Sequence, residues 1–429
     1  MKRIFKGILG VPASLMLAFG IAAFPQSAAQ GQPVPAGLGF NIHIMGNTRN
    51  WDAIKASGAR FIRADYNWAV VEKKKGQYNF TAYDTMLRGL VAAGIRPIFI
   101  LDYGNPLYPK PETSAAGRDA YARWAAASAR HFEGRHVIWE IWNEPNVGFW
   151  KGIGGLNSPT FANEYVALVK KTVSAMRAAN PHCYILGGAV SCLWKGSFKW
   201  LRQALKDGLL RTGINALSVH PYGFPRPELS INTHQPGSAP DEGFAILRQM
   251  MAKAGAPADF PVVASEVGYP TGKKITRGEQ AMLFVRLYVV DQMCHVPLTI
   301  WYNWDTRDAA GFNVYNGRRP LLPIYRACQF MTAQLAGYHF VRRLKVGSRV
   351  DYVVLFEKAG KSKLIIAWTV PKGRNTRPDK ARAQTLVIPT AGVKASVSVR
   401  NIFGKAVPAK ASAGTITVKV TGSPLYITY

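Results

Sequence analysis

Short apolar runs alternate with longer helical patterns from about residue 37 to residue 336. The runs are rich in Val, Ile, Phe or Trp, as buried parallel strands are, and cover residues 38–44, 59–66, 96–103, 137–143, 184–190, 216–222, 260–267 and 298–304. Helices are predicted between them, for example over 83–93, 116–132, 161–179, 198–209, 244–254 and 277–293. Eight such units with right-handed crossovers predict a closed (β/α)8 barrel. A doubly wound sheet is the alternative, but the sequence has no glycine-rich phosphate loop to support it.

The pattern changes after about residue 336. Apolar and polar positions now alternate in short runs that Gly, Pro and Lys interrupt, as in antiparallel strands; the runs include residues 352–356, 364–368, 384–388, 395–399, 415–420 and 425–428. We therefore expect a small β-sandwich over residues 337–429. It is either a carbohydrate-binding module or a structural brace for the barrel.

The N-terminus has the pattern of a targeting segment. Three basic residues among the first six precede a mostly apolar run over 8–24, and Ser27-Ala28-Ala29 follows with small residues suited to cleavage. Residues 1–29 are predicted to be a signal peptide, which leaves a barrel domain over 30–336. A membrane anchor is the alternative, but Gly10, Pro12 and Gly20 interrupt the run and no basic flank follows it. The mature protein is expected to be secreted or periplasmic, with no transmembrane segment.

Export makes disulfides relevant to the four cysteines. Cys183 and Cys192 flank one predicted strand, and an extended backbone would hold them too far apart to pair. Cys294 and Cys328 either form a disulfide or remain buried thiols. No spacing of Cys and His residues resembles a metal site.

The formal net charge of +30 is unusual for an exported enzyme. Residues 341–429 contribute a net +14, from 17 lysines and arginines against three acidic residues. A basic surface of this kind suggests an anionic partner, such as an acidic polysaccharide or the cell envelope. The alternative is that the charge serves solubility alone. No motif indicates specific binding of a nucleic acid.

Two predicted strands end in a glutamate. The run Val137–Asn146 reads VIWEIWNEPN and delivers Glu144, and the run Phe260–Tyr269 reads FPVVASEVGY and delivers Glu266. Two carboxylates at strand ends of one barrel can flank a glycosidic bond, one as proton donor and the other as nucleophile.

These residues resemble clan A of the glycoside hydrolases, most closely family 39 and the related family 5 cellulases. The resemblance implies a retaining enzyme without a cofactor, in which the Asn-Glu pair ends the fourth strand and the nucleophile ends the seventh. Glu144 is then the acid/base and Glu266 the nucleophile. Burial and a neighbouring carboxylate are expected to raise the pKa of Glu144, as a general acid requires.

Other strand ends match the clan as well. The resemblance assigns Asn143 to the sugar 2-OH, Arg63 to the neighbourhood of the nucleophile, and His220 and Tyr222 to the sixth strand, with the tyrosine hydroxyl on the nucleophile. Each residue alone also has a structural explanation, such as a surface ion pair or a core histidine. Glu140, deeper in the fourth strand, is expected to form a structural ion pair and to point away from Asn143 by strand alternation.

Aromatic residues are expected to bind sugar faces. Trp301 resembles the clan's floor for the sugar that is cleaved, and Trp304 is a further candidate. His43, on the first strand, would reach substrate hydroxyls. The sequence thus predicts a retaining β-glycoside hydrolase that cleaves a polysaccharide internally, such as a bacterial exopolysaccharide. Cellulase, mannanase and β-xylosidase are alternatives within the clan, and a non-catalytic polysaccharide-binding protein is the alternative of another class.

Overall fold

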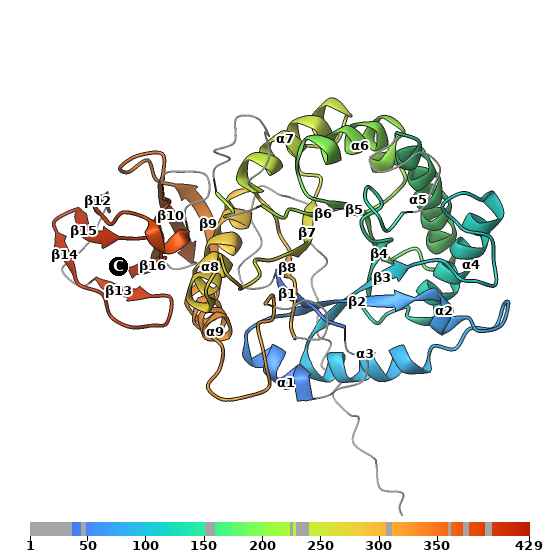
Figure 1. Cartoon of the computed structure of the whole chain (residues 1–429), viewed down its shortest axis with the longest axis horizontal. Coiled ribbons are helices and arrows are strands. Elements are labelled where there is room, and N and C mark those ends of the chain that lie inside the picture. The colour runs from blue at the N-terminus through green and yellow to red at the C-terminus, as the bar shows by residue number, and fades with distance from the viewer. Residues whose placement is uncertain are drawn as a thin grey trace, which may run out of the picture.

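The computed structural model describes residues 37–43, 49–150, 159–223, 226–228, 240–305, 311–358, 362–371, 377–390 and 397–429. Eight parallel strands close into a barrel in sequence order (Figure 1). They are β1 (Leu38–Asn41), β2 (Phe61–Asn67), β3 (Arg96–Asp102), β4 (Ile138–Ile141), β5 (Tyr184–Ser191), β6 (Ala216–His220), β7 (Val262–Val267) and β8 (Thr299–Trp301). The predicted barrel is confirmed, and the doubly wound alternative is wrong because β1 also pairs with β8.

Helices surround the barrel (Figure 1). They are α1 (Arg49–Ala56), α2 (Trp68–Val71), α3 (Thr81–Ala93), α4 (Ala115–His131), α5 (Pro159–Ala179), α6 (Lys195–Lys206), α7 (Pro240–Lys253), α8 (Arg277–Met293) and α9 (Pro323–Leu335). Helix α3 ends at Gly94, whose left-handed φ of 69° suits a residue without a side chain. Their apolar faces cover the outward residues of the strands, which gives the barrel its main core.

The interior of the barrel changes from apolar to polar along the strands. A separate apolar cluster fills the lower part, with members from β2 to β8: Phe61, Ile98, Ile138, Leu186, Ala216, Val263, Leu298 and Ile300. Two residues further along several strands, the inward positions are buried and polar: Asn41, Arg63, Glu140, Ser218 and Ser265. Since inward positions recur every second residue, this polar layer lies directly beneath the carboxyl ends of the strands.

The C-terminal part is a β-sandwich of two antiparallel sheets, as predicted. The order of the first sheet is β13 (Ser398–Asn401), β16 (Leu425–Thr428), β11 (Lys363–Thr369), β10 (Asp351–Lys358) and β9 (Tyr338–Arg343). The second sheet consists of β12 (Gln384–Pro389), β15 (Thr415–Val420) and β14 (Ala409–Ser412). Apolar side chains such as Val353, Ile365 and Ile416 fill the space between them.

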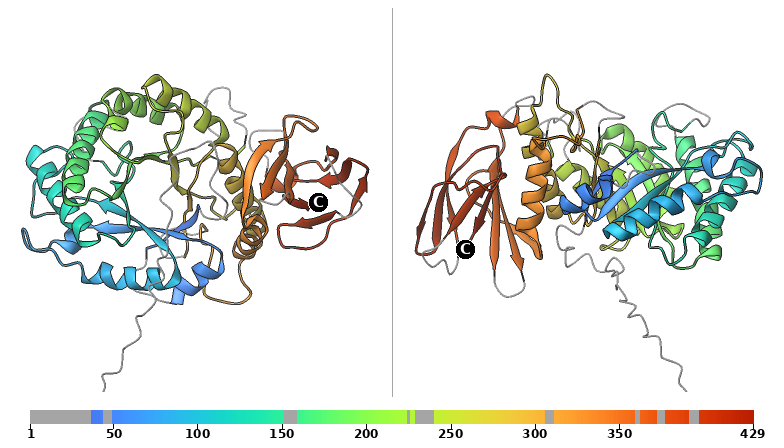
Figure 2. Two further views of the ribbon diagram at one scale, coloured as in Figure 1. Left: turned by 180° about the vertical axis from the view of Figure 1, so that it is seen from behind. Right: turned by 90° about the horizontal axis from the view of Figure 1, so that it is seen from below.

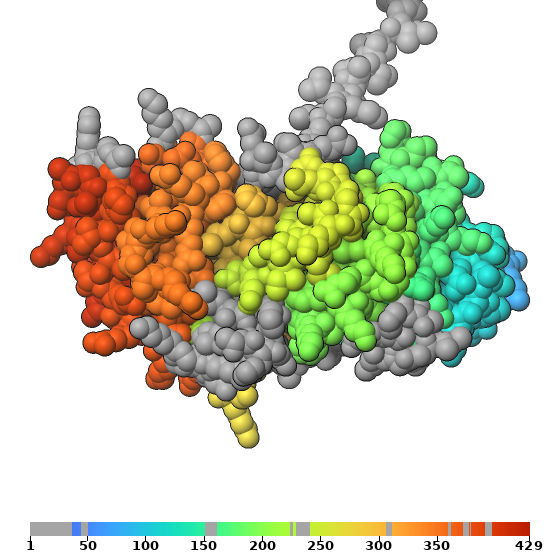
Figure 3. Space-filling view, turned by 90° about the horizontal axis from the view of Figure 1, so that it is seen from above, coloured from blue at the N-terminus to red at the C-terminus, as the bar shows by residue number. Residues whose placement is uncertain are grey.

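The five-stranded sheet is buried on both faces. Val353 and Leu355 of β10 point into the sandwich, whereas Tyr352, Val354 and Phe356 belong to the core shared with the barrel. Helices α8 and α9 lie between the barrel and this sheet (Figure 2), and the space-filling view shows the orange and red sandwich against the side of the barrel (Figure 3). The sandwich is therefore held on the barrel by an apolar surface as well as by polar contacts.

A buried ion pair of the barrel lies at this interface and contacts the sandwich. Arg286 of α8 donates from Nε and Nη2 to the two carboxylate oxygens of Glu228, at 2.5 and 2.6 Å. Trp368 of β11 donates to the same carboxylate at 2.8 Å, and a third Arg286 nitrogen reaches the carbonyl of Gly422. Such a bidentate, fully buried pair has one satisfactory geometry. Its hydrogen bonds with Trp368 and Gly422 therefore join the sandwich to a rigid part of the barrel.

Three further sequence predictions concern the cysteines, membrane-spanning segments and the N-terminus. All four cysteines are free thiols, so a Cys294–Cys328 disulfide is excluded. Among the described residues, no helix combines the length and the hydrophobicity needed to cross a bilayer. The proposed signal peptide, residues 1–29, lies outside the described residues.

Candidate active site

Glu144 stands just beyond the end of β4, in a backbone that turns sharply. Trp142 has a φ of 67° and Glu144 a φ of 46°, both in the left-handed region that residues with side chains seldom adopt. The turn ends the strand alternation at Ile141, so the expectation that Glu140 and Asn143 point in opposite directions is wrong: both contact Arg63. Strained non-glycine residues cluster at functional sites, and here the strain aims a carboxylate into the barrel mouth.

Glu266 lies near the end of β7, where the pairing with β8 shifts register between Ala264 and Val267. Such a bulge re-aims a side chain. It allows Ser265 to lie in the buried polar layer while Glu266 enters the mouth with 14% of its side chain exposed. Tyr222 donates its hydroxyl to Glu266 Oε1 at 2.8 Å, as the clan resemblance implied.

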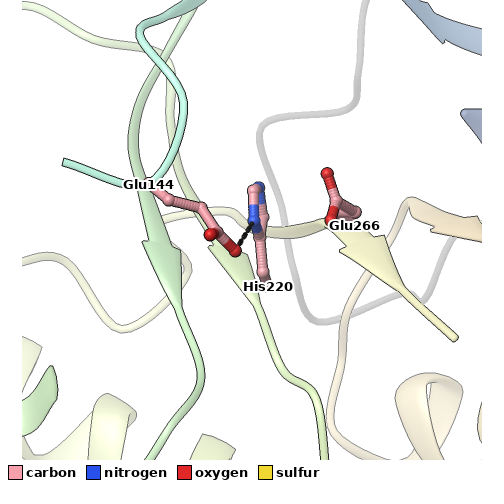
Figure 4. Close-up of side chains that lie close together, drawn as sticks. All are labelled: Glu144, His220 and Glu266. Atoms are coloured by element: carbon pink, nitrogen blue, oxygen red, sulfur yellow. Dashed lines mark hydrogen bonds and ion pairs between the residues drawn. The ribbon is translucent and has the colours of Figure 1, made fainter. Parts of the chain in front are cut away.

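Glu144, His220 and Glu266 converge at the mouth of the barrel (Figure 4). One carboxylate oxygen of each glutamate and one ring nitrogen of His220 all lie within 4.8 Å of one another. Carboxyl groups separated by ~5–5.5 Å are typical of retaining glycosidases, whereas inverting enzymes hold theirs ~6.5–9.5 Å apart to admit a water molecule. The spacing fits the retaining geometry.

Arg63 connects this pair to the residues around it. Its Nε donates to Glu140 at 2.6 Å, Nη1 donates to Asn41 at 3.0 Å and to Glu266 at 2.7 Å, and Nη2 donates to Asn143 at 2.8 Å. Nη2 also lies 3.3 Å from Nε2 of His220. A guanidinium has five N–H groups, and here each one faces a different acceptor, which leaves Arg63 a single orientation.

The contact with Arg63 also fixes the tautomer of His220. Because Arg63 can only donate, Nε2 of His220 accepts, and the neutral ring carries its proton on Nδ1. Nδ1 then donates to Glu144 at 2.9 Å. Burial would raise the pKa of Glu144, but His220, Ser191 and Arg63 together outweigh burial and leave the pKa below its usual value. The expectation of a raised pKa is therefore wrong for the unliganded site.

The same three groups invite comparison with a metal site, since a histidine and two carboxylates can ligate a cation. Two contacts argue against that role. The His220 nitrogen that faces Glu144 carries a proton, and a guanidinium already occupies one side of Glu266. A cation would have to displace both, so the arrangement suits proton transfer and nucleophilic attack.

Two predicted sugar platforms lie elsewhere. Trp301 is fully buried outside the barrel, packs on Phe284 of α8, and donates its indole N–H to a backbone carbonyl. Trp304 is also fully buried, stacked on Tyr315. The binding role expected for both is wrong. Strand β8 ends at Trp301, and alternation from the inward Ile300 makes Tyr302 the next residue on the inner side; Tyr302 contacts the ring of His43.

His43 lies at the mouth, as expected, with 20% of its side chain exposed. Its Nε2 faces the amide nitrogen of Asn41 at 3.0 Å and its Nδ1 lies 3.8 Å from Asp65. Asn41 was not predicted from the sequence, although it precedes His43 by two residues and so shares its face of the strand. Beside this group, burial and the nearby Asp65 carboxylate raise the pKa of Asp102 well above its usual range.

Two partly buried carboxylates lie at this spacing at the mouth of the barrel. One is hydrogen-bonded by an arginine and a tyrosine, and the other by a histidine. This arrangement is that of a retaining glycoside hydrolase. The model of the cellulase family, glycosyl hydrolase family 5, matches residues 28–307. The chain belongs to this family and is a glycosidase. No curated protein matches the sequence.

Solved structures share the whole architecture. A family 39 glycoside hydrolase from the gut symbiont Bacteroides cellulosilyticus WH2 superposes with a TM-score of 0.76 at 20% identity, covering 91% of this chain and 80% of that one. A monomeric beta-xylosidase from Caulobacter crescentus CB15 gives 0.67 at 15% identity, covering 94% and 97%. The family 30 subfamily 8 xylanase Xyn30A from Clostridium acetobutylicum gives 0.61 at 12% identity, covering 94% and 97%. At these identities the likeness shows the fold: a barrel with an attached sandwich.

Proposed function

We propose that this enzyme cleaves a β-linked polysaccharide internally with retention of configuration, using Glu144 as acid/base and Glu266 as nucleophile. The observation that carries the proposal is the placement of the two carboxylates within 4.8 Å, each with different partners. Glu266 receives a hydrogen bond from Arg63 on one carboxylate oxygen and from Tyr222 on the other. Glu144 has His220 beside it, whose Nδ1–H donates to the carboxylate that forms when Glu144 gives up its proton.

In the first step Glu266 attacks the anomeric carbon while Glu144 gives its proton to the departing glycosidic oxygen. Arg63 holds the amide oxygen of Asn143, so the NH2 group of that amide is the end left to meet the sugar 2-OH. In the second step Glu144, now a carboxylate, removes a proton from water. The water attacks the anomeric carbon and releases Glu266, which restores the starting state.

Two exposed aromatic side chains favour a polymeric substrate. Phe149, 49% exposed, follows Glu144 in the loop after β4, and Trp194, 46% exposed, follows β5. The indole N–H of Trp142 donates to the carbonyl of Phe149, and the ring of Phe149 stacks on Tyr103 at 5.9 Å. Since the acid protonates the leaving group, aromatics on the side of Glu144 would bind sugars beyond the cleaved bond, which an endo-acting enzyme requires.

The substrate class is part of the proposal. An exopolysaccharide of the producing bacterium agrees with the basic chain, whose net charge of +30 would attract acidic polymers. The family description names cellulase, and one structural neighbour is a beta-xylosidase. Cellulosic, mannan and xylan substrates are therefore the alternatives, and a non-catalytic polysaccharide-binding protein is the one from another class.

Two further parts of the proposal concern where the enzyme acts. The N-terminal pattern favours export to the periplasm or the medium. The basic sandwich would attach the exported enzyme to an anionic polymer or to the envelope.

At the mouth of the barrel, His43 and Tyr302 would contribute to sugar binding.

The decisive experiment is product stereochemistry. Purified enzyme is screened on glucans, mannans, xylans and acidic exopolysaccharides, and the first product from a responsive substrate is followed by ¹H NMR. A β-anomer formed first, with oligosaccharides rather than monosaccharides as products, supports the proposal. An α-anomer formed first would refute the assignment of Glu266 as nucleophile. As a second arm, Glu266→Ala should be inactive, and azide should restore turnover by giving the glycosyl azide of opposite configuration.

A further inference from the structure

Glu140 is a buried carboxylate that the catalytic steps above do not use. It occupies the middle of β4, has no exposed surface, and lies in the polar layer one inward position below the reacting groups. Its Oε2 accepts from Nε of Arg63 at 2.6 Å. Burial would raise the pKa of Glu140, but the charge of Arg63 and smaller contributions from neighbouring polar groups together outweigh it and leave the pKa below the usual value, so the carboxylate is ionised.

Arg63 thus has two anionic partners on different edges of its guanidinium. Nε faces Glu140 and Nη1 faces Glu266, at 2.6 and 2.7 Å. Burial would lower the pKa of Arg63, but these two carboxylates raise it above its ordinary value, so the guanidinium keeps its charge throughout. One positive charge is shared between a carboxylate that reacts and one that does not.

The two partners differ during the reaction. When Glu266 forms the glycosyl ester, its negative charge disappears, and Arg63 loses that counter-ion while it remains 99% buried. An unpaired charge in such a place is costly. Glu140 has no route to the substrate and keeps its charge, so it still neutralises Arg63 in the covalent intermediate.

We infer that Glu140 is a positioning residue that acts through Arg63: it supplies a permanent counter-ion for the guanidinium and, by sharing its charge, limits how strongly Arg63 stabilises the Glu266 anion. The inference rests on the proposed nucleophile. Other groups that face Glu266 are Tyr222 and His220 of the β6 segment, Glu144 of the β4 loop and Cys192 after β5, while Asp65 of β2 acts on it through Arg63.

The test is the isosteric variant Glu140→Gln, assayed with 2,4-dinitrophenyl β-glycosides of cellobiose, mannose and xylose. These probes need little protonation, so formation of the covalent intermediate depends on Glu266. In Glu140→Gln, Glu266 is the one remaining carboxylate of the described residues that Arg63 contacts directly, so the attraction between the two becomes stronger. We expect the acidic limb of kcat/KM to move to lower pH by about one unit. The plateau should fall by on the order of 10–100-fold. Glu140→Asp, with a retracted carboxylate, should shift the limb in the same direction by less.

A purely structural role predicts another result. If Glu140 only held Arg63 in place, its loss would weaken the contact with Glu266, and the acidic limb would stay or move to higher pH; either outcome overturns the inference. Glu228→Gln is the matched control, since it neutralises a fully buried carboxylate whose arginine partner is Arg286 instead of Arg63. It should lower thermal stability without moving the limb.

A second readout separates this inference from the proposed function. The carboxyl carbon of Glu266 is followed by ¹³C NMR across pH in wild type and in Glu140→Gln, and is assigned with Glu266→Gln. A titration midpoint that falls in Glu140→Gln supports charge sharing, and an unchanged midpoint refutes it. If wild type cleaves none of the probes or polymers, the proposed function fails, whereas the NMR comparison still decides the role of Glu140.

Discussion

In the part of the chain that the structure describes, two arginine–glutamate pairs are fully buried, and they differ in how the guanidinium is used. At the interface, Arg286 directs two of its nitrogens to one carboxylate, Glu228, and the third reaches a backbone carbonyl. At the mouth, Arg63 gives Glu140 only Nε and spends its other four N–H groups on four further acceptors. A guanidinium that binds a single carboxylate stabilises one fixed geometry. A guanidinium that binds several groups couples the charge of each group to the positions of the others, which suits a site where the charge of one group changes during the reaction.

The largest expected effect comes from replacing each arginine by lysine, which should affect activity at the mouth and stability at the interface. Lysine keeps the charge but loses the planar fork of donors. Arg63→Lys should lower kcat/KM on the order of 10³-fold, because Glu266, Asn143 and His220 lose their common anchor. Arg286→Lys should leave kcat/KM within about twofold at temperatures where it is folded. Steady-state kinetics on one aryl glycoside, beside circular dichroism, make the measurement; comparable losses of activity in both variants would break the distinction.

The second prediction concerns stability at the interface. Glu228→Ala leaves Arg286 buried without its carboxylate and removes an acceptor from Trp368. The free energy of unfolding should fall by about 3–5 kcal/mol. Urea unfolding followed by tryptophan fluorescence measures it. Lys363→Ala is the control, because its ion pair with Glu357 is long and partly exposed and should contribute about 0–1 kcal/mol. A loss below about 1 kcal/mol for Glu228→Ala would show that the apolar surface alone holds the sandwich.

The sequence predicted local structure well, and the reason is visible in the strands. Each barrel strand is a short, buried apolar run, and those runs mark the observed positions within a few residues. Strand β14 (Ala409–Ser412) was not predicted because all four of its residues are exposed, so it has no alternating pattern. Trp301 was misplaced because β8 is three residues long, and a shift of one residue moves every side chain to the opposite face.

The site residues were predictable only where a single residue stands out by its type and its position at a strand end. Glu144 and Glu266 stand out at strand ends, and so do His220 and Tyr222. The division of Arg63 among its partners could not be predicted, since Glu140 is 77 residues away in the sequence and Glu266 is 203. Nor could the lowered pKa of Glu144, which depends on the tautomer that Arg63 imposes on His220.

That lowered pKa predicts where the pH dependence of activity arises. As the proposed acid, Glu144 must be protonated, and the hydrogen bond from His220, with Ser191 and Arg63, moves its protonation to more acidic pH against the effect of burial. Polymer cleavage should therefore decline as pH rises from the acidic range, whereas 2,4-dinitrophenyl glycosides should decline less. His220→Ala should raise the pKa of Glu144 and move the basic limb upward by about one pH unit. If the basic limbs of the pH profiles of wild type and variant had the same midpoint, His220 would not have this role.

The smallest effect is expected on the outer sheet of the sandwich, which faces away from the interface. The net +14 of residues 341–429 motivates the hypothesis that this region binds an anionic polymer. Arg382, Lys410 and Lys419 are exposed, and changing all three to glutamine should weaken retention on an acidic polysaccharide column. The attraction should fade with salt, because charges are screened over about 8 Å at physiological ionic strength. Cleavage of a small neutral glycoside should not change, since Glu144 and Glu266 belong to the barrel. Wild type and the triple variant are eluted along one salt gradient; co-elution would show that the charge serves solubility and that the sandwich acts as a brace.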